Sequence, residues 1–198
     1  LAATAEADDG TLVWRTITTP HFRVHYPEPH GPQAQRLARR AERAHEILAP
    51  VLRHVPAQRT HIVLRDNHDS ANGSAQIIPY NQINAHLVSP ESFSLLHDFD
   101  DWLFDLIIHE YAHILHLDTT HGWTRAYNAI FGKTFAWNQV QPRWFIEGLA
   151  TYYESAQTSS GRVRSSVVDA VLRAAVLEGR APRIDQLGSE RRAFPRGH

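Results

Sequence analysis

The chain has 198 residues and a mass of 22.5 kDa, a length that suits a single compact domain. It carries 20 Lys and Arg residues against 21 Asp and Glu residues, and its formal net charge of -1 gives no electrostatic reason to expect a nucleic-acid partner. Cysteine is absent and no apolar run is long enough to span a bilayer, so the sequence predicts neither a cysteine-based metal site nor a transmembrane segment.

The first half of the chain, residues 11–90, is predicted to be rich in strands. Phe22, Val24 and Tyr26 alternate with polar residues, which is the period of a half-buried strand. Residues 32–54 instead place apolar side chains at three- and four-residue steps opposite a row of arginines, which predicts an amphipathic helix. The predicted strands cover residues 12–18, 21–26, 60–64, 75–78 and 82–88, with a loop over residues 66–74.

The second half, residues 100–180, is predicted to be mostly helical. The predicted helices cover residues 101–117, 142–157 and 167–178. The first of them is apolar nearly all round, as is typical of a buried helix, and Ser165 or Ser166 is expected to cap the last. Strands followed by helices indicate the α+β class, with a small mixed sheet in the N-terminal half.

The sequence His109-Glu110-Tyr111-Ala112-His113 lies in the predicted buried helix and carries the main chemical signal among 14 histidines. Side chains four residues apart share a helix face, so both imidazoles can bind one metal ion, whereas Glu110 lies about 100° around the helix, beside that ion. This arrangement is typical of a zinc hydrolase in which the glutamate is the general base. The alternative is a structural domain without metal, in which hydrogen bonds satisfy these side chains.

A catalytic zinc ion requires a third protein ligand. His116 lies on the same face as His109, but about 10 Å away along the helix axis, and one ion with bonds of about 2 Å cannot bind both. Position 119, where a metzincin has its third histidine, is Thr119. The third ligand is therefore expected from another segment of the chain.

The predicted helix 142–157 offers two candidates, Glu147 and Glu154. They share a helix face, but they lie seven residues apart and cannot both bind one ion. A glycine in a helix interior costs about 1 kcal/mol relative to alanine, so Gly148 leads us to expect a close approach between this helix and the one that carries His109.

The His109–His113 motif together with the run Trp144–Glu154 (WFIEGLATYYE) resembles the gluzincins, the thermolysin-like zinc metallopeptidases. The chain is most similar to the peptidase-MA-like domain family of bacterial proteins. The likeness covers most of the chain, since it extends to Trp14–Phe22, Asp66–Ala75 and Gly161-Arg162.

This resemblance implies one thermolysin-like peptidase domain over residues 1–198 that hydrolyses peptide bonds of a peptide or protein substrate. One Zn²⁺ would be held by His109, His113 and Glu147, with Glu110 as the general base and Glu154 as a supporting or structural residue. A strand above the cleft, residues 75–78 or 82–88, would pair with an extended peptide. Because such proteins are often exported and some carry a β-propeller after this domain, we expect a secreted or periplasmic fragment of a longer chain.

The sequence also departs from the family pattern. The spacing between His113 and Glu147 is long, so residues 118–141 resemble an insertion. The signature of the gluzincin aminopeptidases is absent, and an exopeptidase is therefore not supported. The oxyanion donor has no clear match; its candidates are Tyr152 and Tyr153 and, more weakly, Tyr80, His86 and His121.

Two further expectations complete the sequence-based reading. A zinc-binding recognition module that no longer cleaves, within a larger propeller-containing protein, is the alternative function. The remaining histidines, among them His21, His25 and His61, are scattered along the chain and are expected to be surface or locally hydrogen-bonded residues.

Overall fold

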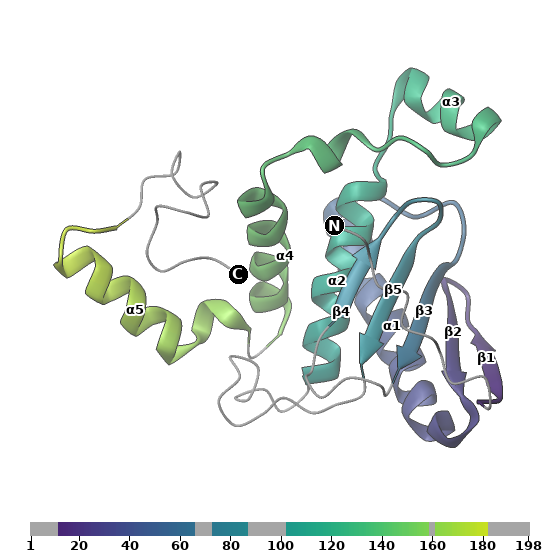
Figure 1. The fold of residues 1–198 in the computed structure, drawn as a ribbon, viewed down its shortest axis with the longest axis horizontal. Helices are drawn as coiled ribbons and strands as arrows, with labels where there is room; N and C mark the ends of the chain where they lie inside the picture. Colours follow the sequence, from purple (N-terminus) through teal and green to yellow (C-terminus); the bar gives the residue numbers. More distant parts are fainter. Residues whose placement is uncertain (1–11, 66–72, 87–101, 159–160, 182–198) are drawn as a thin grey trace.

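Five short strands form one mixed sheet in the order β1-β2-β3-β5-β4 (Figure 1). The computed structural model describes residues 12–65, 73–86, 102–158 and 161–181. Strands β2, β3 and β5 run parallel, and the outer strands β1 and β4 run antiparallel to their neighbours. The strands are β1 (Trp14–Thr18), β2 (Phe22–Pro27), β3 (Thr60–Arg65), β4 (Gly73–Gln76) and β5 (Gln82–His86).

The sheet buries one of its two faces. In β3, Thr60, Ile62 and Leu64 are buried, whereas the residues between them remain partly exposed, because successive side chains of a strand point to opposite faces. Phe22 and Val24 of β2 are buried on the same side. The other face of the sheet is more polar.

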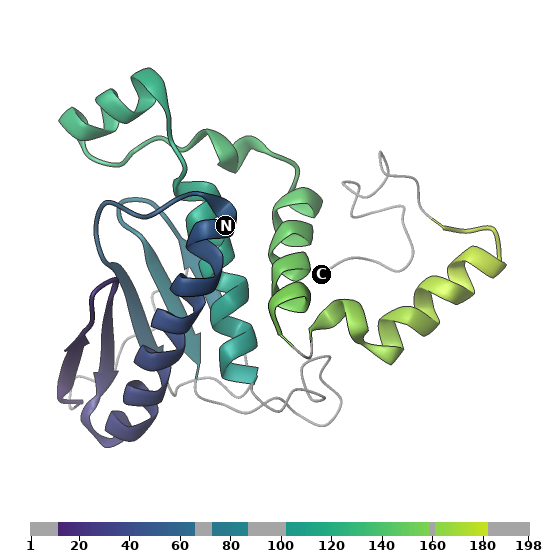
Figure 2. The same cartoon turned by 180° about the vertical axis from the view of Figure 1, so that it is seen from behind.

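Helices α1 (Gly31–Leu52) and α2 (Trp102–Asp118) cover the buried face, as the view from behind shows (Figure 2). A buried hydrogen bond of 2.7 Å joins the two helices, from the Tyr111 hydroxyl to Nδ1 of His45. Burial raises the pKa of Tyr111 and lowers that of His45. The phenol therefore keeps its proton, and the neutral imidazole accepts the hydrogen bond from it. This bond fixes the rotation of α2 about its own axis relative to α1.

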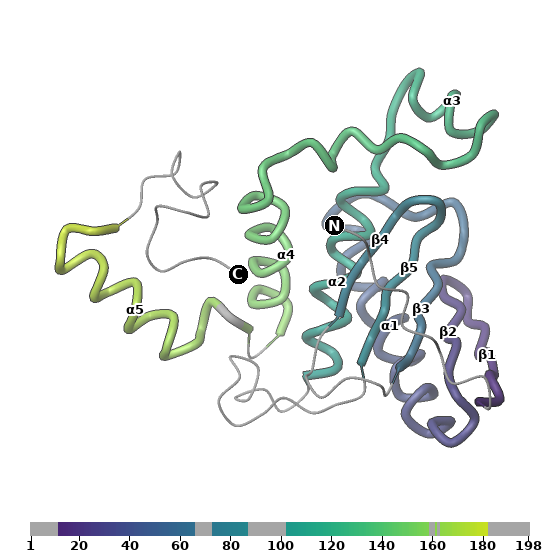
Figure 3. Tube along the Cα trace, viewed as in Figure 1, coloured from purple at the N-terminus to yellow at the C-terminus, as the bar shows by residue number. Residues whose placement is uncertain are grey.

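Helix α4 (Arg143–Gln157) lies beside α2, on the side away from α1 (Figure 3). It buries Ala150 in the common core. Helix α3 (Gly122–Phe131) projects from the body, and α5 (Ser166–Leu177) lies beyond α4. The Ser165 side chain caps α5 by accepting a hydrogen bond from the backbone N–H of Val168. Three short 3-10 helices complete the described structure: η1 (Glu28–His30), η2 (Trp137–Val140) and η3 (Arg162–Arg164).

The predicted α+β class is confirmed, with the mixed sheet in the first half and helices in the second. The predicted loop over residues 66–74 is wrong at its end, because Gly73 and Ser74 belong to β4; residues 66–72 lie outside the described residues. Gly and Ser have low strand propensity, and pairing with β5 overrides it. Helix α3 was not predicted. Residues 87 and 88 of the strand predicted over 82–88, and the first residue of the helix predicted over 101–117, also lie outside the described residues.

Among the residues described, no helix combines the length and the apolar character that crossing a bilayer requires.

A half-buried polar cluster at the end of α2 links the base of the α3 segment to the body of the fold. Asp118 accepts a hydrogen bond of 2.9 Å from Nε2 of His54 and another from the ammonium of Lys133, which also donates to Asn81. Burial raises the pKa of Asp118, but the hydrogen bonds from His54 and Lys133 and the charge of Lys133 outweigh it and lower the pKa from 3.8 to about 2. The ionised carboxylate therefore stabilises the folded state.

We expect Asp118→Asn to lower the free energy of unfolding at neutral pH by about 2 kcal/mol, because the half-buried Lys133 loses its counter-charge. A carboxylate whose pKa is lowered in the folded state stabilises that state at pH values above the pKa of the unfolded chain. The difference in free energy of unfolding between wild type and variant should therefore be largest above pH 3.8 and should vanish as the pH falls toward about 2. Denaturant unfolding at several pH values measures it. Asp169→Asn, on the exposed Asp169–Arg173 pair of α5, is the control. A difference that does not depend on pH would contradict the assignment.

Candidate metal centre

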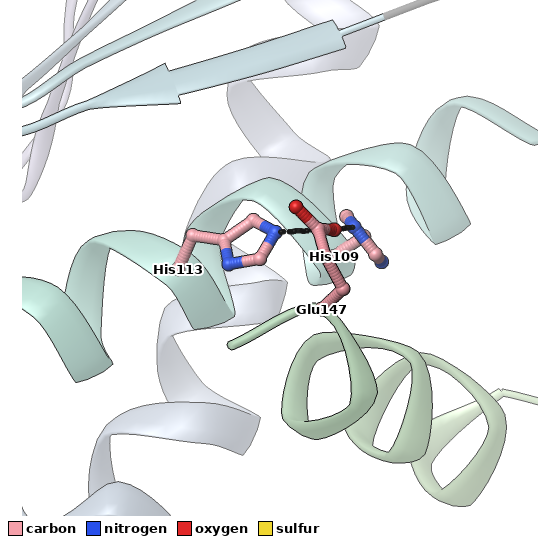
Figure 4. Close-up of side chains that lie close together, drawn as sticks. All are labelled: His109, His113 and Glu147. Atoms are coloured by element: carbon pink, nitrogen blue, oxygen red, sulfur yellow. Dashed lines mark hydrogen bonds and ion pairs between the residues drawn. The ribbon is translucent and has the colours of Figure 1, made fainter. Parts of the chain in front are cut away.

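Three side chains from two helices converge between α2 and α4 (Figure 4). His109 and His113 point from α2 toward α4, and Glu147 points back from α4. Their facing atoms lie 3.2 Å apart (His109 Nε2 to His113 Nε2), 3.4 Å apart (His113 Nε2 to Glu147 Oε2) and 3.6 Å apart (His109 Nε2 to Glu147 Oε2). Within the described part of the chain, this is the group of three side chains whose ligand atoms come close enough to share an ion.

The spacing of these three atoms fits the geometry of a zinc site. Zinc bonds to imidazole nitrogen and carboxylate oxygen are about 2.0–2.1 Å long, and at tetrahedral angles two such ligand atoms lie about 3.3 Å apart. The three observed separations lie on either side of that value. Two imidazoles and one carboxylate, with room for a fourth ligand, also match the donor set of catalytic rather than structural zinc sites.

Glu154 bonds the opposite side of the His109 ring. Its Oε2 lies 2.9 Å from His109 Nδ1, and both side chains are almost fully buried, at 1% and 4% exposure. The Glu154 carboxylate can only accept, so Nδ1 of His109 donates its N–H to it and the ring adopts the tautomer whose Nε2 carries the lone pair that a metal ligand needs. The two glutamates on one helix face therefore divide their roles around His109: Glu147 faces Nε2 and Glu154 faces Nδ1.

Glu147 is the most exposed of the three candidate ligands, with 40% of its side chain accessible. Hydrogen bonding to the imidazoles of His109 and His113 holds the pKa of Glu147 well below its usual range and outweighs the opposing effect of burial. The Glu147 carboxylate is therefore ionised at neutral pH. Its exposure leaves one side of the group open to solvent and to a substrate.

Glu110 is buried, at 6% exposure, and lies under strand β4. A Cβ atom at Gly73 of β4 would lie 3.1 Å from Oε1 of Glu110 and 2.8 Å from the Leu106 side chain. Only glycine lets the strand pass this close without displacing the carboxylate. Strand β4, whose first two residues were predicted to be loop, therefore covers the proposed general base.

The end of α4 next to Glu154 is held by a turn that sequence reasoning used only as part of the family likeness. Gly161 has φ = 103°, and a Cβ there would lie 2.6 Å from the Cα of Ser155. The backbone N–H of Val163 donates to the Ser155 hydroxyl at 3.1 Å, and the Arg164 guanidinium donates to the Ser155 carbonyl. These contacts anchor the residue that follows Glu154. A glycine soon after the predicted helix end is the sequence signal that could have indicated this turn.

The other candidate residues are not brought to the three ligands by a described hydrogen bond or ring contact. The Tyr152 side chain is exposed (61%), whereas Tyr153 packs against the core, and their rings contact each other. Tyr80 contacts the His61 ring, and His121 lies just before α3. His86 is the last residue of β5. The structure therefore favours none of these five residues as the oxyanion donor.

The predicted role of Gly148 is wrong. A Cβ at this position would meet no atom within 4 Å, so the glycine does not permit a close approach to α2. The contact between the helices instead runs through Ala150, which is 1% exposed.

Comparison with known proteins identifies one similar chain of unstated function. The chain is 26% identical over 183 residues to an uncharacterized protein of Treponema pallidum (strain Nichols), which covers 91% of this chain. The chain spans 16% of the length of that relative. No family model and no solved structure matches the chain.

We expect Glu154→Gln to weaken zinc binding about 10- to 100-fold, because the neutral amide no longer fixes the Nδ1-protonated tautomer of His109. Competition with a chromophoric chelator measures the affinity. Glu46→Gln is the control, since Glu46 is exposed and pairs only with Arg43 on the surface of α1 among the described residues. Equal zinc affinity in Glu154→Gln and wild type would show that the buried carboxylate does not support a metal ligand.

Proposed function

We propose that this chain is a zinc-dependent metallopeptidase of the gluzincin type. The observation that carries the proposal is the convergence of His109, His113 and Glu147 at zinc-ligand spacing, with Glu154 on the far side of the first imidazole. A buried carboxylate that bonds the far nitrogen of a histidine is typical of metal sites, where it fixes the tautomer of the ligand. The resemblance to the peptidase-MA-like family and its thermolysin-like fold supports the same reading.

The side chains divide the reaction among them. A zinc ion, when bound, supplies a Lewis acid and lowers the pKa of a coordinated water toward about 7. Glu110 accepts the proton of the attacking water at its carboxylate and returns it to the leaving amine. His109 is kept in its ligand tautomer by Glu154, and the depressed pKa of Glu147 keeps that carboxylate ionised. Glu110 is buried beneath β4, which holds its carboxylate away from bulk water.

The substrate that fits this arrangement is an extended peptide lying along β4. Strand β4 is the last strand of the sheet and pairs only with β5 among the described residues, so its other edge can pair with a peptide backbone. Of the two strands considered for this role, β5 does not qualify, because β3 and β4 occupy both of its edges. Since Gly73 of β4 contacts Glu110, a peptide on this edge would run beside the general base.

The secreted or periplasmic location and the attached β-propeller belong to the same proposal, since both rest on the family resemblance. The alternative is a zinc-binding recognition module that does not cleave. The two functions differ in whether the zinc-bound protein hydrolyses peptides with Glu110 as the base. The following variant tests that difference.

We expect Glu110→Gln to retain zinc and to lose about 10²- to 10⁴-fold in peptide hydrolysis, because the amide cannot accept a proton from water. Cleavage of a broad peptide library, with and without chelator, and the zinc content of each protein are the measurements. Glu28→Gln, on an exposed surface pair, is the control. Unchanged turnover in Glu110→Gln would end the general-base assignment, and wild-type protein that binds zinc but cleaves nothing would favour the recognition module.

We expect Gly73→Ala to lower turnover about tenfold with unchanged zinc content, because the added methyl group pushes against Glu110 and Leu106. Steady-state kinetics and metal analysis measure the two properties. Gly148→Ala is the matched control: its methyl group meets nothing, and it should keep full turnover while stabilising α4 by about 1 kcal/mol. Full activity in Gly73→Ala would show that β4 does not constrain the general base.

A further inference from the structure

A second cavity of about 440 Å³ lies at the end of the sheet where β2 and β3 begin. One of its lining residues, Tyr111, is two positions after His109 on α2 and therefore points about 200° away from it around the helix. The cavity is thus separate from the candidate metal centre. Its volume is within the range of small-molecule sites, about 300–1,000 Å³. The lining residues are Pro20, His21, Arg23, Pro56, Ala57, Gln58, Arg59, His61 and Tyr111.

The lining is rich in groups that carry or can carry positive charge, and it includes no carboxylate. Arg23 and His61 are neighbours in the parallel register of β2 and β3, so their side chains leave the same face of the sheet. Arg59 comes from the segment before β3 and His21 from the segment before β2. Within the described part of the chain, Arg23 makes no ion pair.

The acidic residue nearest to this group is already engaged. Both carboxylate oxygens of Glu42 bond His21: one lies 2.7 Å from its ring Nδ1, and the other accepts its backbone N–H at 2.9 Å. Arg59 is held in place by a hydrogen bond of 2.8 Å from its Nε to the carbonyl of Thr19, which leaves its two terminal nitrogens for another acceptor. The two guanidinium groups thus lack a counter-charge from the cavity wall.

A chain of hydrogen bonds leads to the cavity through two histidines. The Thr16 hydroxyl lies 2.9 Å from Nδ1 of His25, whose Nε2 lies 2.9 Å from Nδ1 of His61. If the Thr16 hydroxyl donates to Nδ1 of His25, then Nε2 of His25 carries a proton and donates to Nδ1 of His61. His61 then carries its own N–H at Nε2. An anion in the cavity favours this direction. Burial lowers the pKa of both rings and the positive charge of Arg23 lowers it further, so the rings favour the neutral form in which each donates one N–H and accepts at its other nitrogen.

We propose that this cavity binds a phosphoryl group. Two guanidinium groups, the His61 N–H and the Gln58 amide offer more donors than the two oxygens of a carboxylate can accept, whereas a phosphoryl group has three acceptor oxygens and a charge close to -2. Guanidinium groups bind such oxygens through paired hydrogen bonds. The group can belong to inorganic phosphate or to a small phosphate ester, and the two sources share this chemistry.

The test is a titration of the chain with inorganic phosphate, O-phosphoserine and acetate at about 0.15 M salt, which screens non-specific attraction. Calorimetry gives the affinity, and NMR of the histidine rings locates the site. We expect both phosphates to shift the His61 and His25 resonances, and acetate to bind at least about tenfold more weakly. Tighter binding of phosphoserine than of phosphate would assign an ester as the ligand, and equal binding would assign the free ion.

We expect Arg23→Gln and Arg59→Gln each to weaken phosphate binding at least about tenfold, because each removes a charge-assisted contact. Arg43→Gln changes the net charge equally, but Arg43 lies on the exposed face of α1, where it pairs with Glu46. This variant should bind phosphate as wild type does. Thermal melting shows that each variant is folded; Arg23 and Arg59 are exposed and tolerate the change. Absence of binding, equal binding of acetate, or equal weakening by Arg43→Gln would overturn the proposal.

Discussion

The docking of α4 against α2 is the constraint on which the candidate metal centre depends. Helix α2 supplies both imidazoles by its own periodicity, but α4 supplies both carboxylates, and each reaches a different nitrogen of His109. A rotation of α4 by one residue would move both away, because Glu147 and Glu154 share a single helix face. Tyr111 and His45 fix the rotation of α2, and the turn at Gly161 fixes the end of α4. The precision of the group is therefore a property of the helix pair.

Much of this arrangement could be predicted from the sequence. Spacing alone placed His109 and His113 on one face and excluded His116 as a partner, because helix geometry is regular. Spacing could not decide between Glu147 and Glu154, since that choice depends on where α4 packs along α2. Gly148 misled for the same reason: helix propensity marks a glycine as costly, but only packing shows that Ala150 makes the contact. Strand β4 was misplaced because its pairing with β5 outweighs the low propensity of Gly73 and Ser74.

The basic cavity shows a different limit of sequence reasoning. His21, His25 and His61 are scattered in the chain and were expected to be surface or locally hydrogen-bonded residues. Their assembly depends on the parallel register of β2 and β3, which pairs residues almost 40 positions apart and is set by tertiary packing. The positive charge at the cavity comes from Arg23 and Arg59, which both line it, a circumstance that net charge does not reveal. A chain with a formal charge of -1 can thus concentrate unpaired positive charge at one end of its sheet.

The contribution of ligands from both α2 and α4 also has a thermodynamic consequence. A cation held jointly by the two helices acts as a clasp between segments that are more than thirty residues apart in sequence. Its binding energy then adds to the adhesion of α4 to the body, and the melting temperature rises with free zinc by mass action. Loss of such a cation would weaken the attachment of α4 first, since Ala150 is the one fully buried apolar residue that α4 gives to the core among the described residues. The supply of the ion would in this way govern how firmly α4 is held to the rest of the fold.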